Sequence, residues 1–355
     1  MRRYGLLLPV VLLLTAFCGS EATPPEVATA EPIVPADVQL EKLFTRTADI
    51  NGGLTEGPAV APDGSIYFSD IPFGSDKGLM MRFDPKTMET SVFAEDSGKS
   101  NGLTFSADGH LLAAEGADQG GRRISRWNVE TGERTTVADN YEGKKFNAPN
   151  DICQDSKGRI YFSDPRYLGS EPRELEHLAV YRINTDGSVI EVTHEVEKPN
   201  GVALSPDEKT FYLADHNNGT ERITDPDVPK GEHGAMKVYA FPLGDDGLVN
   251  GPRRTLVDFG KEAGCDGMTV DEQGNIYLTA RSLKRPGVLI INPEGEEVGF
   301  IATGPENQTD PANAKGLPSN VEFGVGDGAN VLYVTIDLSL YRVRLNVKGH
   351  HRQYM

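Results

Sequence analysis

One short unit recurs six times along the chain and limits the folds that are open to it. Each copy has a leading polar residue, a strand of small and apolar residues, a tight turn, and a second strand with Tyr, Phe or Leu. In residues 147–165 (NAPNDICQDSKGRIYFSDP), alternation predicts Ile160 and Phe162 on one face of the second strand and Tyr161 on the other. The six leading polar residues are Glu56, Asn101, Asn150, Asn200, Asp266 and Asn320.

The spacing of these copies indicates one closed array. The leading residues are 45, 49, 50, 66 and 54 positions apart, at or somewhat above the length of a four-stranded propeller blade of about 40–50 residues. With 39 Gly, 23 Pro and no long helical periodicity after residue 20, the composition is that of an all-β protein. We therefore predict a single six-bladed β-propeller over residues 41–349.

Local signals refine this prediction at the turns and at the first strand. Gly64, Gly109 and Gly274 follow polar residues in the tight turns, where a positive φ is needed. Leu40–Thr47 alternates enough to form a strand, and we expect it to close the ring by pairing with the C-terminal blade. Residues 350–355 are expected to form a short tail.

The first 40 residues differ in composition from the rest. Arg2 and Arg3 precede an apolar run and then small residues, so residues 1–18 are interpreted as an export signal, too short to span a membrane. Its end resembles a lipoprotein cleavage site at Cys18, although Phe17 departs from that pattern. The predicted protein is exported, either as a periplasmic or membrane-anchored lipoprotein or as a secreted form. Residues 19–40 are expected to be a flexible Pro/Ala/Glu-rich tether.

Charge and cysteine content exclude several functions. The net charge of −18 argues against nucleic acid as a partner, because phosphate binding needs clustered Lys and Arg. Three cysteines do not make a disulfide framework, so Cys153 and Cys265 are expected to be buried free thiols. The sequence leaves the oligomeric state open, with a monomer favoured.

Two polar insertions interrupt the repeat. One follows Asp215 and ends at Gly234, and the other spans residues 304–318. Loops of this length either overhang a mouth of the channel or lie in solvent, and both readings stay open. His216 and His233 in the first insertion are interpreted as solvated loop residues.

The leading residues are the candidate functional group. The innermost strands of a propeller line its channel, so equivalent positions form a ring of carboxyl and amide groups. Buried polar groups need partners, and a cation supplies one. Oxygen ligands favour Ca²⁺ or Mg²⁺ over Zn²⁺. The alternative is that these side chains cap strands and turns.

Longer motifs then resemble a known family. EGP at 56–58, NGLTF at 101–105, PNGVALSPD at 199–207 and CDGMTVD at 265–271 are similar to the gluconolactonase branch of the senescence-marker-protein, gluconolactonase and luciferin-regenerating-enzyme family. The resemblance covers residues 41–349. It implies a six-bladed propeller that binds one divalent metal at its axis, most often Ca²⁺ with Mg²⁺, Mn²⁺ or Zn²⁺ possible, and that hydrolyses sugar lactones such as gluconolactone.

The resemblance also implies roles for individual residues. The metal ligands would be Glu56, Asn150, Asn200 and Asp266. Asp151 would support a ligand, and Asn101 and Asn320 would bind water or substrate. Arg166 and Tyr167 would lie near the mouth and recognise substrate, whereas Arg122 and Arg123 are expected to form salt bridges at a blade edge.

Two departures from the family pattern concern the substrate. Ala148 stands where some members carry an Arg that contacts the sugar, and the usual DPPYG reads DPRYL at 164–168. The metal site therefore transfers from the family better than the substrate does.

The implied reaction is metal-assisted hydrolysis, in which the cation polarises the lactone carbonyl and Asp266, or alternatively Glu56, takes a proton from water. The rival functions are a phosphotriester hydrolase on the same site and a binding propeller without catalysis.

Overall fold

The computed structural model describes residues 1, 31–47 and 52–351 of the 355-residue chain. Residues 2–18 of the export signal predicted over 1–18, including Cys18, lie outside the described residues, as do residues 19–30 of the predicted tether. Pro32–Met355 forms one compact unit. Across the described part of the chain, no helix combines the length and the apolar character that a membrane crossing needs.

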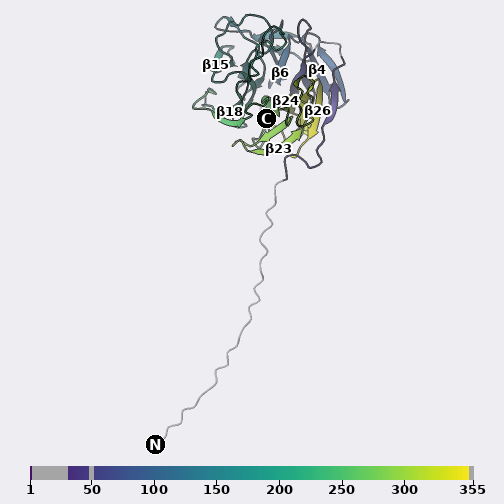
Figure 1. Cartoon of the computed structure of the whole chain (residues 1–355), viewed down its shortest axis with the longest axis vertical. Coiled ribbons are helices and arrows are strands. Elements are labelled where there is room, and N and C mark those ends of the chain that lie inside the picture. The colour runs from purple at the N-terminus through teal and green to yellow at the C-terminus, as the bar shows by residue number, and fades with distance from the viewer. Residues whose placement is uncertain (2–30, 48–51, 352–355) are drawn as a thin grey trace. The chain divides into compact units, whose positions relative to one another are not determined.

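Six four-stranded antiparallel sheets form the blades (Figure 1), and in blades 1 to 5 the first strand of the sheet is nearest the axis. Blade 1 consists of β2 (Leu54–Val60), β3 (Ile66–Ile71), β4 (Leu79–Asp84) and β5 (Glu89–Ala94). Blade 2 consists of β6 (Ser100–Phe105), β7 (Leu111–Glu115), β8 (Arg123–Trp127) and β9 (Arg134–Ala138). Blade 3 consists of β12 (Ile152–Gln154), β13 (Ile160–Asp164), β14 (Ala179–Ile183) and β15 (Val189–Thr193). Between blades 2 and 3, β10 (Asn140–Tyr141) and β11 (Lys144–Lys145) make a small hairpin.

The second half of the chain repeats this plan. Blades 4 and 5 consist of β16 (Pro199–Leu204), β17 (Thr210–His216), β18 (Met236–Pro242) and β19 (Arg254–Asp258), and of β20 (Cys265–Val270), β21 (Ile276–Ala280), β22 (Gly287–Ile291) and β23 (Glu297–Ala302). Blade 6 takes β24 (Pro318–Phe323), β25 (Val331–Ile336) and β26 (Ser339–Arg344) from the C-terminal end. Two short 3-10 helices, η1 (Pro311–Asn313) and η2 (Gly326–Gly328), lie in loops.

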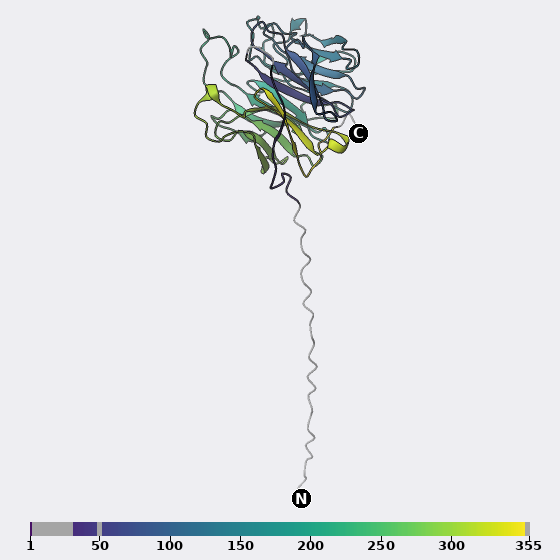
Figure 2. The same cartoon turned by 90° about the vertical axis from the view of Figure 1, so that its right-hand side faces the viewer.

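The ring is closed by the first strand of the chain. β1 (Glu41–Thr45) pairs antiparallel with β26 and becomes the outer strand of blade 6, where the first and last strands lie side by side (Figure 2). On the inside, each innermost strand contacts the next one, and β24 contacts β2. The predicted six-bladed propeller and its closing strand are confirmed.

The hydrophobic core is divided into six layers, one between each pair of neighbouring blades. Alternation along the second strands builds these layers, because successive side chains point to opposite faces of a sheet. Ile160 and Phe162 pack toward blade 2, and Tyr161 packs toward blade 4. The faces predicted for this strand are therefore correct, and every blade is held from both sides.

Both predicted boundaries of the propeller are wrong. Ile33, Val34, Val38 and Leu40 pack against the layer between blades 5 and 6, so the part of the tether from residue 32 to 40 belongs to the fold. Four apolar residues without periodicity gave no sequence signal for this packing. At the other end, His350 N donates to Val270 O at 3.2 Å, so residues 350 and 351 continue the fold rather than begin a tail.

The turn glycines behave as predicted. Gly64, Gly109 and Gly274 have φ values of 88°, 80° and 88°, a region that side chains with a Cβ rarely adopt. Cys153 and Cys265 are both free, and Cys265 is buried. Cys153 is only half-buried, because it lies beside a cavity of the channel, so the prediction that it is buried is wrong.

Candidate functional site

The leading polar residues are aimed at the axis by irregularities in the innermost strands. The register of β2, β6, β16, β20 and β24 against the second strand shifts at or beside the leading residue. Such bulges bend a strand and re-aim a side chain. In blade 3, Asn150 precedes β12, and its backbone N–H is held by Ser163 O at 2.9 Å.

Glycines beside the leading residues let neighbouring blades approach closely. A Cβ at Gly57 would lie 2.2 Å from Asn101 O, and one at Gly201 would lie 2.2 Å from Asp266 O. At Gly267 the obstacle would be the Asn320 side chain, 2.1 Å away. The polar-glycine pairs of the repeat are therefore a packing requirement of the axis.

Five of the six leading side chains line one cavity of about 180 Å³: Glu56, Asn101, Asn150, Asn200 and Asp266. They come from five different blades. All four residues that were predicted as metal ligands are in this group, together with Asn101.

Hydrogen bonds orient several of these donors. Glu56 is 2% exposed, and its Oε2 accepts from Gly57 N at 2.8 Å. Asp266 Oδ2 lies 3.3 Å from Arg281 Nη1. Asn200 donates from Nδ2 to Tyr167 Oη at 3.1 Å, which turns its amide oxygen the other way.

The residues present fit a cation. Burial raises the pKa of Glu56 well above its ordinary value, and the negative charges of Asp266 and Asp151 raise it further. Among the described side chains, Asn101 Oδ1 is buried without a hydrogen-bond partner. A site with crowded carboxylates and an unsatisfied amide oxygen has the donor chemistry of a hard divalent ion such as Ca²⁺.

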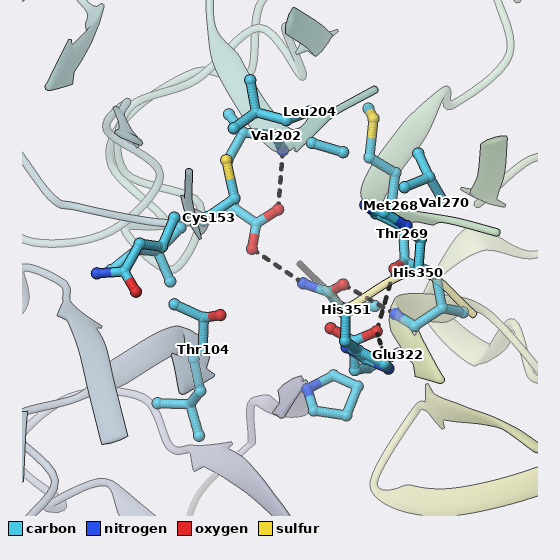
Figure 3. A pocket seen from close by; sticks show the side chains of 18 of the residues that line it. Thr104, Cys153, Val202, Leu204, Met268, Thr269, Val270, Glu322, His350 and His351 are labelled. Atoms are coloured by element: carbon cyan, nitrogen blue, oxygen red, sulfur yellow. Dashed lines mark hydrogen bonds and ion pairs between the residues drawn. The ribbon is translucent and has the colours of Figure 1, made fainter. Parts of the chain in front are cut away.

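The sixth leading residue, Asn320, does not join the group. Asn320 and Asp151 line a second cavity of about 90 Å³. Residues from the later part of the innermost strands, such as Thr104, Leu204 and Glu322, line it as well (Figure 3). Asn320 Nδ2 donates to Asp151 Oδ1 at 3.3 Å, and its Oδ1 accepts from Val321 N at 2.8 Å. Asn320 therefore lies apart from the other five leading residues, because the ring positions are staggered along the channel, and the expectation that it binds water or substrate stays a prediction.

Asp151 was expected to support a metal ligand, and its carboxylate contacts other residues of the innermost strands. Its Oδ2 accepts from Val202 N of blade 4 at 2.9 Å, and its Oδ1 accepts from Asn320 of blade 6. Asp151 therefore links the innermost part of blade 3 to the innermost strands of blades 4 and 6. Burial raises the pKa of Asp151 to about 7. None of its hydrogen bonds goes to a side chain of the four candidate ligands.

Of the two residues expected at the mouth, Tyr167 lines the ligand cavity and Arg166 does not. Tyr167 lines the ligand cavity, and its hydroxyl donates to His216 O at 2.9 Å. Arg166 is 2% exposed and donates to Asn147 O and Glu171 O, at 2.9 and 3.0 Å, so it positions the loop before Asn150 and does not reach the cavity.

The two neighbouring arginines of blade 2 have structural contacts. Arg123 Nε pairs with Glu115 Oε2 at 2.8 Å, the predicted blade-edge salt bridge. Arg122 makes no such pair in the described structure and donates from Nε to Phe146 O at 2.8 Å.

Sequence reasoning missed His216, Arg281 and Lys99, which all line the ligand cavity. His216 is buried at the end of β17, so the prediction of a solvated histidine is wrong, while His233 is exposed as expected. Burial lowers the pKa of His216. A signal was available, because His216 and Arg281 occupy equivalent positions at the end of the second strand of their repeats, as Ile71 does in the first.

The two insertions have different positions. Asn218 and Ile223 of the first insertion line the ligand cavity, and Ile223 N donates to Tyr167 O at 2.9 Å. No residue between 304 and 318 lines it. Only the first insertion therefore shapes the candidate site.

A further group of possible metal ligands lies in blade 3, outside both channel cavities: His177, Glu191 and His194. The two imidazoles are stacked, with centroids 3.9 Å apart and planes 21° from parallel. Parallel stacked rings do not direct two in-plane nitrogen lone pairs at one ion. In this structure the three residues form a contact cluster, in which His194 Nδ1 lies 2.6 Å from Glu191 Oε1.

Closed blades and axial oxygen donors define the class of protein: a six-bladed propeller with a candidate cation site in its channel. The chain belongs to the SMP-30/Gluconolactonase/LRE-like family, whose characteristic region matches residues 54–336. It is 30% identical over 322 residues to a gluconolactonase of Zymomonas mobilis, an alignment that covers 83% of this chain and 79% of the relative.

Solved structures agree with this fold. A gluconolactonase from Xanthomonas campestris superposes with a TM-score of 0.68 at 24% identity and covers 88% of this chain and 94% of its own. Regucalcin from Agrobacterium tumefaciens, described as a calcium-binding protein, gives a TM-score of 0.64 at 18% identity and covers 88% and 96%.

Proposed function

We propose that this chain is a divalent-cation-dependent lactonase that opens a cyclic ester to a hydroxy acid. The observation that carries the proposal is that Glu56, Asn150, Asn200 and Asp266, from four blades, line one cavity. The gluconolactonase among its relatives supports the reaction class. The regucalcin likeness supports the propeller, and the donor set supports Ca²⁺.

The four oxygen donors would hold the cation. When bound, a divalent ion polarises a carbonyl oxygen and brings water close to it, which contributes several kcal/mol of transition-state stabilisation in enzymes of this kind. Asn101 is placed to add its unsatisfied amide oxygen, either to the cation or to a water molecule.

Asp266 is the better candidate for the general base. Its side chain is 14% exposed and is held by Arg281, whereas Glu56 is almost fully enclosed and hydrogen-bonded to its neighbouring backbone. A base must reach the proton that it removes. Asp266 would take a proton from the attacking water as the water oxygen forms a bond to the carbonyl carbon. The ring C–O bond would then break, and the departing oxygen would receive that proton from Asp266 and become the hydroxyl of the product.

Tyr167 would hold the side-chain amide of Asn200 in place. Its hydroxyl accepts from Asn200 and donates to His216 O, so both of its hydrogen bonds are made within the protein. It fixes the amide of a candidate ligand, as outer contacts of metal sites commonly do.

Glu56→Gln and Asp266→Asn test the proposal. We expect both variants to lose lactone hydrolysis, which is measured as acid release at constant pH. Their circular dichroism spectra and melting transitions should stay close to those of the parent. Glu322→Gln, the same chemical change in the other cavity, should leave hydrolysis unaltered. Hydrolysis of a phosphotriester but of no lactone would replace the proposed function with the rival one, and binding of Ca²⁺ without any turnover would reject catalysis.

We also propose that the protein is exported, on the strength of the charged, apolar and small-residue order of residues 1–18. Cell fractionation tests this. A lipid on Cys18 would hold the protein in the membrane fraction until Cys18→Ala releases it, while a cytoplasmic protein with an intact leader would reject export.

A further inference from the structure

The cavity that holds the candidate ligands has an extensive apolar side. Six side chains form this surface, which we call the apolar wall: Leu54, Ile71, Phe73, Ala117, Leu168 and Ile223. They come from blades 1 to 3 and from the first insertion. Ala148, at the position where some family members carry an arginine, adds to the same lining.

Several polar side chains of this cavity already have partners within the protein. Lys99 Nζ pairs with Asp118 at 2.9 Å, and Arg281 donates to Pro318 O and pairs with Asp266. Asn218 Oδ1 accepts from Lys198 Nζ at 2.9 Å. Lys99, Arg281 and Asn218 therefore use part of their hydrogen-bonding capacity within the protein. A hydroxyl placed against the apolar wall itself would lose its water without gaining a partner there.

Two members of the wall are placed by specific contacts. Ile223 is 37% exposed although it sits in a polar insertion, and its backbone N–H is fixed to Tyr167 O. Phe73 rests on Gly52, where a Cβ would lie 2.3 Å from its ring. An exposed isoleucine and a supported phenylalanine at one cavity are the arrangement expected where an apolar ligand group is covered.

We propose that the preferred substrate is a lactone that carries an alkyl substituent, with its ester over the oxygen donors and its alkyl group on the apolar wall. This rests on the proposed lactonase function and specifies its substrate class. Each methylene that the wall removes from water should raise kcat/KM by about fourfold, until the cavity is filled.

The test uses the full-length protein with Ca²⁺ and measures acid release from glucono-1,5-lactone, from unsubstituted γ-butyrolactone, and from γ-lactones with alkyl chains of increasing length. We expect kcat/KM to rise along the alkyl series and to exceed the value for gluconolactone. Ile223→Asn should flatten the rise with chain length. Val298→Asn, an equally polar change at another exposed apolar residue outside the cavity, should leave the series as it is.

The outcomes separate the two proposals. Faster hydrolysis of gluconolactone than of every alkyl lactone would overturn the inference and leave the lactonase assignment standing. An alkyl preference that Ile223→Asn does not reduce would show that the wall is not its cause and would also overturn it. No hydrolysis of any lactone would remove the proposed function and the inference with it.

Discussion

Gly201 connects the packing at the axis to the geometry of the candidate site. It follows Asn200 in β16 and faces the backbone of blade 5. In Gly201→Ala the new methyl carbon would lie 2.2 Å from Asp266 O and 3.0 Å from Gly267 Cα. Gly201 is not at positive φ, so alanine itself fits the backbone there and the whole cost comes from the clash.

The size of the effect follows from that distance. Real Cβ contacts below 3.0 Å are essentially never seen, and a backbone oxygen cannot rotate away, so β16 and β20 must separate by about 1 Å. Overpacking of this kind costs about 1–3 kcal/mol of stability. Because Asn200 and Asp266 lie on the two displaced strands, we expect about a hundredfold loss of kcat/KM, the usual effect of a 1 Å misplacement.

The assay compares Ca²⁺ affinity by calorimetry, lactone hydrolysis and the melting temperature in the parent and in Gly201→Ala. Gly109→Ala is the matched control, because φ is 80° there and no atom lies within 4 Å of the added carbon. It should lower stability by about 1 kcal/mol and leave hydrolysis intact. A Gly201→Ala protein with parental Ca²⁺ affinity and rate would refute the claim that close blade contact sets the site.

Three further predictions concern separate parts of the molecule. Deleting residues 40–47 removes β1 from blade 6 and should lower the melting temperature by about 10 °C or more, and an unchanged value would contradict closure by this strand. Arg281→Met should reduce kcat about tenfold because Asp266 loses its partner, whereas Arg285→Met at the blade edge should not. Burial raises the pKa of Glu322 to about 7, so the contribution of its protonated form to stability is present below about pH 4.5 and is lost as the pH rises through about 7. Glu322→Gln should therefore weaken the fall in melting temperature between about pH 5 and pH 8. An unaltered fall would argue against titration of Glu322.

Most of the fold could be predicted from the repeat in the sequence. Alternation correctly placed Ile160 and Phe162 on one face of the second strand and Tyr161 on the other, because every blade reuses one pattern of side-chain directions. Leu40–Thr47 was also recognisable, since a closed ring needs a partner for its last edge. Residues 32–40 were not, because their few apolar side chains bind an existing surface and follow no period of their own.

The site was predictable only where it follows the repeat. Glu56, Asn150, Asn200 and Asp266 share a position in the pattern and meet in space, but the pattern does not show how far along the channel each one projects, and Asn320 lies in the other cavity. The bulges that decide this leave no simple mark in the sequence. His216 was missed because it directly adjoins an insertion, and Arg166 was misplaced because its motif departs from the family pattern.

We propose that one divalent cation, held by Glu56, Asn150, Asn200 and Asp266, is required for hydrolysis. The most direct test removes the metal from the purified protein with a chelator and then measures lactone hydrolysis while Ca²⁺ is returned in known amounts. We predict that activity is lost on chelation and returns in proportion to about one equivalent of Ca²⁺, and that Asp266→Asn recovers none. Full activity in the metal-free protein would contradict a requirement for the cation.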